Sequence, residues 1–167
     1  MRIGILSDTH DQLATTHRAV SLLQREGAEV LVHCGDLTGP EIVRACAVLP
    51  FVVAFGNHDA DNLPTLERAI AENGGTCLGS GGIIELAGKR VAVVHGHVGM
   101  KDLLAAKPDF LLHGHSHIAA DCIVDGTRRI CPGALNRAES LTVALLDTDT
   151  GLLRTLRLSG EETLPLD

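Results

Sequence analysis

The chain has 167 residues, of which 45% are hydrophobic, and this length and composition predict one folded domain that spans residues 1–167. A formal net charge of −7, with three Phe and neither Tyr nor Trp, argues against nucleic-acid binding through the backbone or by base stacking. Five cysteines without a Cys-x-x-Cys pair argue against a disulfide framework, and no segment approaches the roughly 18 apolar residues of a membrane span, so we expect a soluble, cytoplasmic protein.

Strand and helix patterns alternate over the first part of the chain. Three short apolar runs end at polar motifs and predict buried strands: residues 3–6, 30–34 and 51–55. Residues 13–26 show helical spacing and end at Gly27, which predicts a helix with a left-handed cap. Pro40 and Pro64 are typical first-turn residues of two further helices. This alternation, which continues to about residue 73, indicates parallel strands joined by crossover helices.

Strand pairs with short connections dominate the second part. Three pairs of apolar runs are separated by connections of hairpin length: residues 83–86 and 90–94, 120–124 and 127–131, and 141–146 and 152–158. Asp125-Gly126 in the second pair is a strong signal for a two-residue turn. We therefore expect an α/β fold with parallel strands in its front half and mixed strands in its back half.

Polar strings rich in Asp and His follow several of these runs. They are Ser7-Asp8-Thr9-His10, Gly35-Asp36, Gly56-Asn57-His58-Asp59 and His113-Gly114-His115-Ser116-His117. Ligands of open α/β sheets bind beyond the carboxyl ends of the strands, where these strings lie. Side chains two residues apart in an extended segment point the same way, so Asp8 and His10 can bind one cation together. Carboxylates and imidazoles gathered from distant segments are what two neighbouring divalent cations need.

Each string also has an ordinary structural interpretation. Asp36 after Gly35 could be a turn aspartate, and His33, inside an apolar run, is expected to be a hydrogen-bonded core histidine. Three imidazoles within residues 113–117 would repel one another if charged, which favours a bound cation. The spacing does not choose between His113 and its neighbours in that run, nor between His95 and His97.

The strings together resemble the calcineurin-like metallophosphoesterases, and within that family the small bacterial and archaeal phosphodiesterases. The similarity covers nearly the whole chain and is carried by Ser7-Asp8-Thr9-His10, His33-Cys34-Gly35-Asp36, Gly56-Asn57-His58-Asp59, Val94-His95-Gly96-His97 and Gly114-His115-Ser116-His117. It implies a four-layer α-β-β-α sandwich of two mixed sheets flanked by helices. One departure is Cys131-Pro132-Gly133-Ala134, where many relatives carry Asn-Pro-Gly-Ser.

The resemblance also implies two metal sites that share one carboxylate. The first site would consist of Asp8, His10, Asp36 and His117. The second would consist of Asp36, Asn57, His95 and His115. The resemblance, and not the spacing, is what selects His95 and His115 at this point. The cofactors expected are two divalent cations, with manganese first and nickel, iron or zinc also suited to mixed nitrogen and oxygen ligands.

The implied activity is hydrolysis of a small phosphate ester, most specifically a phosphodiester. A hydroxide that bridges the two metals would attack in line, and His58 would assist the leaving group with Asp59 as an orienting partner. Arg137 and Lys101 could contact phosphate, although such charges are common on surfaces. Members of the subgroup tend to form dimers or larger assemblies, so a homo-oligomer is compatible with the resemblance.

Two other functions compete with hydrolysis. The retromer subunit of the same family is a protein-interaction scaffold that has lost the catalytic histidine, and a metal-sensing regulator would bind cations without turnover. The presence of His58 and of the full ligand set argues against a scaffold.

Overall fold

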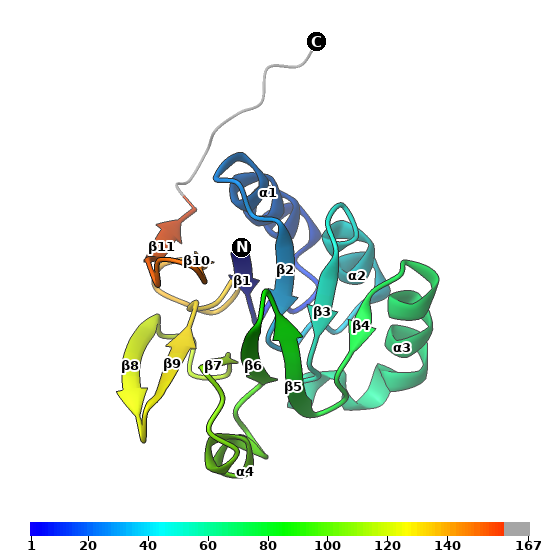
Figure 1. The fold of residues 1–167 in the computed structure, drawn as a ribbon. Helices are drawn as coiled ribbons and strands as arrows, with labels where there is room; N and C mark the ends of the chain where they lie inside the picture. Colours follow the sequence, from blue (N-terminus) through cyan, green and yellow to red (C-terminus); the bar gives the residue numbers. More distant parts are fainter. Residues whose placement is uncertain (159–167) are drawn as a thin grey trace.

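The computed structural model describes residues 1–158, which form two β-sheets packed face to face (Figure 1). The first sheet has the strand order β11-β10-β1-β2-β3-β4. Its strands are β1 (Arg2–Leu6), β2 (Val30–His33), β3 (Phe51–Val53), β4 (Thr76–Cys77), β10 (Thr142–Asp147) and β11 (Leu153–Arg157). Strands β1 to β4 are parallel, as the alternating pattern predicts, and β10 runs antiparallel to β1.

Three helices cover the outer face of the first sheet: α1 (Leu13–Arg25), α2 (Pro40–Cys46) and α3 (Leu63–Glu72). Gly27, two residues after α1, has φ +88°, which confirms the predicted left-handed cap. Pro40 opens α2, and Pro64 lies in the first turn of α3, where its missing N–H has no helical partner to lose. A short 3-10 helix, η1 (Asn57–Asn62), precedes α3.

The second sheet has the order β5-β6-β7-β9-β8. Its strands are β5 (Gly81–Leu86), β6 (Lys89–Val94), β7 (Phe110–His113), β8 (Ala120–Val124) and β9 (Thr127–Cys131). All three predicted hairpins form, as β5–β6, β8–β9 and β10–β11. At the tip of the β8–β9 hairpin, Asp125 and Gly126 have φ +50° and +86°, the two left-handed residues that a tight hairpin turn requires.

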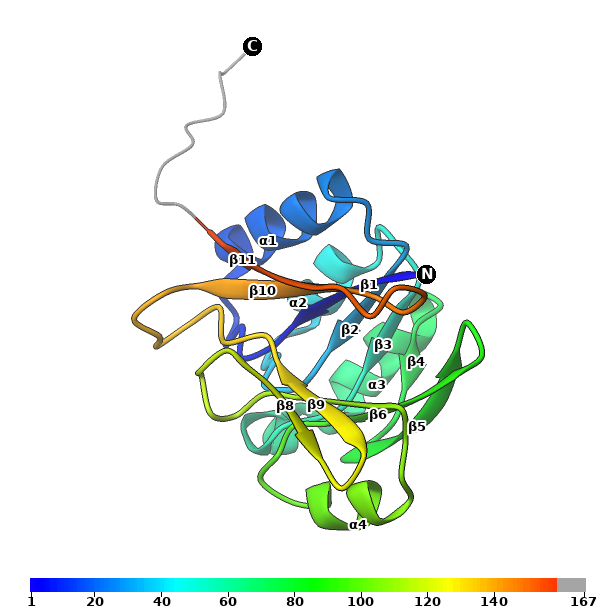
Figure 2. The ribbon, with the colours of Figure 1, turned by 60° about the vertical axis from the view of Figure 1, so that its left-hand side comes forward.

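Apolar side chains fill the three spaces between the layers. One cluster, which includes Ile5 and Val93, lies between the two sheets, and a second lies between the first sheet and helices α1 to α3. A third, smaller cluster packs α4 (Met100–Ala105) on the outer face of β6 and β7. Figure 2 shows α4 on the side of the molecule opposite to α1. The expected four-layer sandwich is therefore confirmed.

Four elements were not predicted: η1, β4, α4 and β7. Helix α4 has six residues and β4 has two, so neither is long enough for a hydrophobic period to show in the sequence. Helix α4 provides the crossover that makes β6 and β7 parallel. No helix within residues 1–158 is long and apolar enough to span a bilayer.

Candidate metal centre

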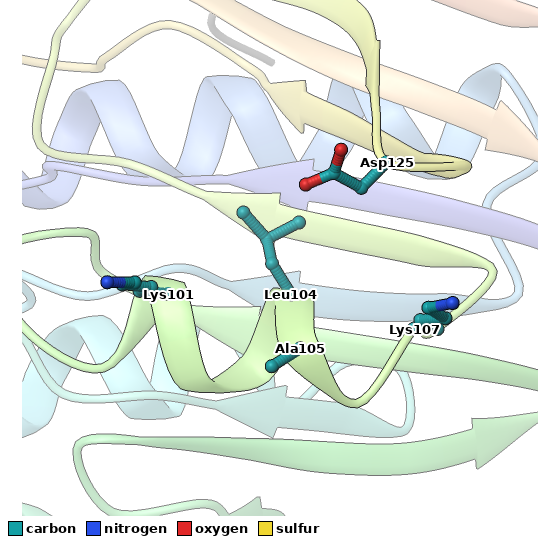
Figure 3. Close-up of a pocket in the computed structure, with 5 residues that line it drawn as sticks. All are labelled: Lys101, Leu104, Ala105, Lys107 and Asp125. Atoms are coloured by element: carbon teal, nitrogen blue, oxygen red, sulfur yellow. The ribbon is translucent and has the colours of Figure 1, made fainter.

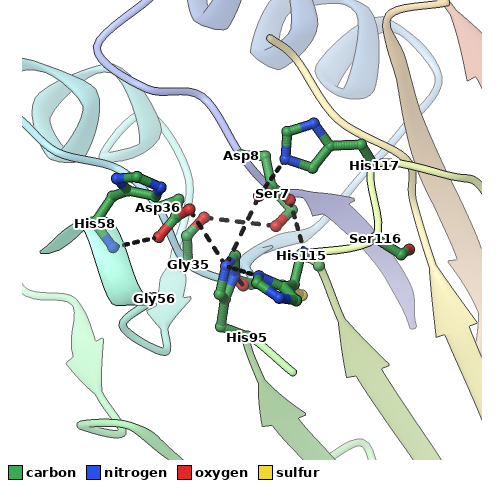
Figure 4. A network of polar contacts seen from close by, with 12 residues as sticks. Ser7, Asp8, Gly35, Asp36, Gly56, His58, His95, His115, Ser116 and His117 are labelled. Carbon is green, nitrogen blue, oxygen red and sulfur yellow. Dashed lines mark hydrogen bonds and ion pairs between the residues drawn. The ribbon is translucent and has the colours of Figure 1, made fainter. Parts of the chain in front are cut away.

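The predicted polar strings meet at one end of the sandwich (Figure 4). Asp8, Asp36 and Asn57 follow the carboxyl ends of β1, β2 and β3 in the first sheet. His95 follows β6 in the second sheet, and His115 lies two residues beyond β7. The carboxyl ends of parallel strands lie at the same edge of a sheet. The potential ligands of the two sheets therefore meet where these edges of the packed sheets lie next to each other.

The first group of potential ligands consists of Asp8, His10 and His117, whose ligand atoms lie within 4.8 Å of one another. Nε2 of His117 is 3.1 Å from Oδ1 of Asp8. Nε2 of His10 is 3.6 Å from Oδ2 of Asp36. These four residues are the ones that the resemblance implied for the first metal.

The second group consists of Asp8, Asp36 and His95. Nε2 of His95 is 3.3 Å from Oδ2 of Asp36 and 3.8 Å from Oδ1 of Asp8. Nδ1 of His115 lies 3.3 Å from Nε2 of His95. Asp36 thus faces His10 of one expected site and His95 of the other, and Asp8 belongs to both close groups.

Two histidines are oriented by hydrogen bonds to backbone carbonyls. Nδ1 of His95 is 2.8 Å from the carbonyl oxygen of Cys34, and Nδ1 of His117 is 3.2 Å from that of Arg137. A carbonyl only accepts, so each Nδ1 carries the proton, and Nε2 of the neutral ring presents a lone pair to carboxylate oxygens. Lone pairs that face anionic oxygens need a cation between them, and this orientation is characteristic of histidines that bind metals.

Two buried atoms of the first group lack a hydrogen-bond partner within the described part of the chain: Oδ1 of Asp8 and Nε2 of His10. Asp8 itself is fully buried, and an unpaired buried carboxylate oxygen is costly. A divalent cation would satisfy both atoms. The residues present therefore fit the metal centre that the sequence predicted.

Charges within the cluster shift the titration of its members. Burial favours the neutral acid of Asp36, but hydrogen bonds with the His95 ring and from the His58 N–H bring its pKa down to about 2. Burial opposes a charged His95 ring, yet the Asp36 carboxylate outweighs it and raises the pKa of His95. The pKa of His10 is lowered, chiefly by burial.

The remaining predicted ligands lie at the exposed side of the cluster. Asn57 is exposed at the start of η1, and its side chain belongs to neither close group of ligand atoms. His115 is also exposed; its ring touches that of His95, and its backbone N–H donates to Oδ2 of Asp8 at 3.1 Å. The assignment of Asn57 and His115 to a second metal stays a prediction.

The alternative histidines lie elsewhere. His113 is 5% exposed, shares the α4 face of β7 with Leu111, and belongs to neither ligand group. The His97 ring is exposed, with its centroid 5.5 Å from that of His95. His95 belongs to a close group and His97 does not, so the geometry favours His95. His113 and His115 belong to neither group, but Nδ1 of His115 faces Nε2 of His95, whereas Nδ1 of His113 faces the carbonyl oxygen of Gly114.

The His58 ring lies beside His10 and belongs to neither close group of ligand atoms. Its backbone N–H donates to Oδ1 of Asp36 at 2.9 Å, which ties the start of η1 to the shared carboxylate. The ring is exposed, and its centroid lies 5.0 Å from that of His10 in an edge-to-face arrangement. It can therefore donate a proton to a group bound at the mouth of the site.

Left-handed backbone conformations are concentrated at the predicted ligands. Eleven non-glycine residues within residues 1–158 have positive φ, and five of them are Asp8, His10, Asp36, His115 and His117. This conformation costs energy in residues with a Cβ, and such residues cluster at functional sites. The backbone is also closely packed at this point, because a Cβ atom added to Gly56 would lie only 2.0 Å from Oδ1 of Asp36. The local backbone is thus shaped around the ligands, which motif spacing alone does not reveal.

The Asp59 carboxylate holds two of the site loops together. Its Oδ2 accepts the N–H groups of Asp36 at 2.9 Å and Gly56 at 2.8 Å, and its Oδ1 accepts the N–H of Thr38 at 2.8 Å. Asp59 is fully buried, and its oxygens face these backbone groups rather than the His58 ring, the partner that we expected. Its contacts make it a positioning residue for Asp36.

Asp59→Ala is expected to lower the free energy of unfolding by at least about 3 kcal/mol, because three backbone N–H groups lose their acceptor at about 1–3 kcal/mol each when buried. Urea unfolding of the metal-free protein measures this loss. Asp61→Ala, an exposed change on the same 3-10 helix, is the matched control. Equal stability of the two variants would contradict the role assigned to Asp59.

His33 is confirmed as a hydrogen-bonded core histidine. Its Nδ1 accepts the Gly35 N–H at 3.2 Å, so Nε2 carries the proton and donates to Oγ1 of Thr9 at 3.1 Å. The Thr9 hydroxyl then donates to the carbonyl oxygen of Asp36 at 3.2 Å. This chain links β2 to the loops that carry Asp8 and Asp36. Burial, with a smaller effect of His95, lowers the pKa of His33 to about 3.

Because the folded pKa of His33 lies below its ordinary value of 6.5, the unfolded chain binds the proton more readily. Stability present above pH 6.5 should therefore be lost as the pH falls toward 3, by up to about 1.4 kcal/mol per pH unit. His33→Asn keeps an acceptor for Gly35 and does not titrate. Urea unfolding at pH 7.5 to 4 should show wild type losing stability faster than this variant, and parallel profiles would refute the prediction.

Residues 1–151 match the calcineurin-like phosphoesterase superfamily domain. The chain is similar to phosphodiesterase MJ0936 of Methanocaldococcus jannaschii, with 27% identity over 156 residues that cover 89% of this chain and 94% of that protein. The solved structure of a novel archaeal phosphodiesterase superposes with a TM-score of 0.85 at 26% identity and covers 95% of this chain and 100% of that one. Vps29 of Entamoeba histolytica, solved with Zn²⁺, shares the fold at a TM-score of 0.59 and 17% identity, covering 95% of this chain and 98% of that one.

Proposed function

Since the chain belongs to the calcineurin-like phosphoesterase superfamily, we propose that it is a metal-dependent hydrolase of small phosphate esters, and of phosphodiesters in particular. The observation that carries the proposal is the pair of Nε2 lone pairs, on His95 and His117, that face the carboxylates of Asp36 and Asp8. The relative named as a phosphodiesterase supports the diester preference.

We assign the first metal to Asp8, His10, Asp36 and His117, and the second to Asp36, Asn57, His95 and His115. When bound, two divalent cations would activate a water molecule as the nucleophile and neutralise the charge on the phosphate oxygens. Manganese is our first choice, and nickel, iron and zinc suit the same mixture of nitrogen and oxygen ligands. The protein's part is to hold these side chains in place through backbone carbonyls and the Asp59 carboxylate.

His58 is assigned to the leaving group. Its ring lies beside His10 at the exposed mouth of the site, and its N–H is anchored on Asp36, so the ring has a defined position without being a ligand. An imidazole there can donate a proton to the departing ester oxygen, which would otherwise leave as an unstable alkoxide. Proton donation by such a group typically contributes about 10²- to 10⁴-fold to the rate.

Hydrolysis of bis-p-nitrophenyl phosphate and of p-nitrophenyl phosphate tests the proposal. The full chain is stripped with a chelator and assayed alone and with Mn²⁺, Ni²⁺, Fe²⁺ or Zn²⁺. We expect no activity without metal, restoration by at least one cation, and a preference for the diester. Bound metal without turnover in all four cases would instead favour a scaffold or a metal-sensing regulator.

A further inference from the structure

Arg137 lies in a loop that runs along the first metal group. The loop starts after Ala134, and the Leu135 N–H donates to the carbonyl oxygen of Ser7 at 3.2 Å. The carbonyl oxygen of Arg137 then accepts the Nδ1 proton of His117 at 3.2 Å. The backbone of Arg137 is therefore fixed directly beside a predicted ligand.

The conformation of Arg137 is unusual in the same way as that of the ligands. Its φ is +52°, and its N–H donates to Oδ1 of Asn136 at 2.9 Å, which helps to hold this turn. A glycine would adopt the conformation without strain and would present the same carbonyl to His117. The backbone contact alone thus gives no reason for an arginine side chain here.

The guanidinium carries a charge that the described residues do not neutralise. Arg137 is exposed, and no carboxylate within residues 1–158 pairs with it, whereas Arg44, Arg128 and Arg154 each have a carboxylate partner. The backbone contact with His117 places this residue at the edge of the first ligand group.

A positive charge beside a site for two cations is repelled unless an anion comes between them. Guanidinium groups bind phosphate with two parallel hydrogen bonds and stay charged at any working pH. Resting on the proposed function, we propose that Arg137 is a substrate-binding residue that holds a phosphoryl oxygen left free by the metal centre. That oxygen belongs either to the scissile phosphate of a monoester or to a second phosphate of the substrate.

Lys101, the other basic residue singled out in the sequence, lies in a different place. Figure 3 shows it on α4, at the rim of a pocket of about 530 Å³ between that helix and the tip of the β8–β9 hairpin. Its neighbours there are Leu104, Ala105, Lys107 and Asp125. Lys101→Ala therefore removes an exposed positive charge without touching the metal centre, and it is the matched control for Arg137→Ala.

Two measurements on the metal-loaded protein test the proposal: calorimetric binding of inorganic phosphate and of pyrophosphate, and the kinetics of p-nitrophenyl phosphate and bis-p-nitrophenyl phosphate hydrolysis. A charge-assisted hydrogen bond contributes about 1.5–3 kcal/mol, so Arg137→Ala should weaken anion binding about 10- to 100-fold. Arg137→Lys should recover part of the loss. Metal content and thermal unfolding should change little in Arg137→Ala, and Lys101→Ala should match wild type in binding and turnover.

The pattern of losses identifies the source of the oxygen. Weaker binding of both anions, with a higher KM for the monoester, assigns it to the scissile phosphate. Weaker binding of pyrophosphate alone assigns it to a second phosphate. Unchanged binding of both anions by Arg137→Ala overturns the inference even if wild type is an active hydrolase. Calorimetry gives this answer without turnover, so failure of the proposed function would be seen separately.

Discussion

Asp36→Asn is expected to reduce phosphoester hydrolysis by about 10³-fold or more, because the change weakens metal binding and electrostatic stabilisation together. Oδ2 of Asp36 faces both His10 and His95, and Oδ1 accepts the His58 N–H. With a pKa of about 2, this carboxyl is ionised under any working condition. Asparagine is neutral and presents an NH₂ group on one side, so it cannot bridge two cations.

Metal analysis and kinetics on the same samples measure this effect. We expect Asp36→Asn to retain fewer cations per chain than wild type after dialysis, and to unfold no earlier in the metal-free state. Asp121→Asn, which removes an exposed carboxylate paired with Arg128, is the matched control and should keep full activity. Wild-type metal content and turnover in Asp36→Asn would remove Asp36 from the proposed centre.

His58→Ala is expected to lower kcat by about 10²- to 10⁴-fold while the metal content stays unchanged. The N–H that binds Asp36 is a backbone group and survives the substitution, and the ring belongs to neither ligand group. The loss should be larger for an alkyl diester than for bis-p-nitrophenyl phosphate, because p-nitrophenolate leaves without much help from an acid.

Comparison of the two leaving groups distinguishes a proton donor from a structural residue. A structural role would lower the turnover of both esters by the same factor, or would release metal. His17→Ala, an exposed histidine on α1, controls for loss of an imidazole and should behave as wild type. Equal losses for the alkyl and the aryl ester would count against His58 as general acid.

The order of strands and helices followed from sequence patterns because most elements carry a local signal. Gly27, Pro40 and Asp125-Gly126 mark a helix end, a helix start and a turn through their own backbone preferences. Which sheet packs on which was not contained in those signals and came from the family resemblance. Elements as short as α4 and β4 cannot be predicted from sequence periodicity, because they have too few residues to complete a hydrophobic period.

The ligand motifs were recognisable because their residue types and their positions after strands reflect metal chemistry. The partners of Asp59 could not be predicted, because three N–H groups from two loops converge on it only after folding. Arg137 was likewise one basic residue among several until the His117 contact placed it at the site. Interactions between distant segments depend on tertiary packing, which residue spacing does not encode.

The left-handed conformations of the proposed ligands imply a trade-off between the proposed catalysis and the stability of the fold. Each such residue with a Cβ lowers the free energy of unfolding by on the order of 1 kcal/mol. Packing in the rest of the domain must offset this loss. Glycine at these positions would relax the backbone and would also delete the ligand. A lineage that no longer needed turnover could therefore gain stability by losing its ligands, and a working enzyme is held to the less stable sequence by selection.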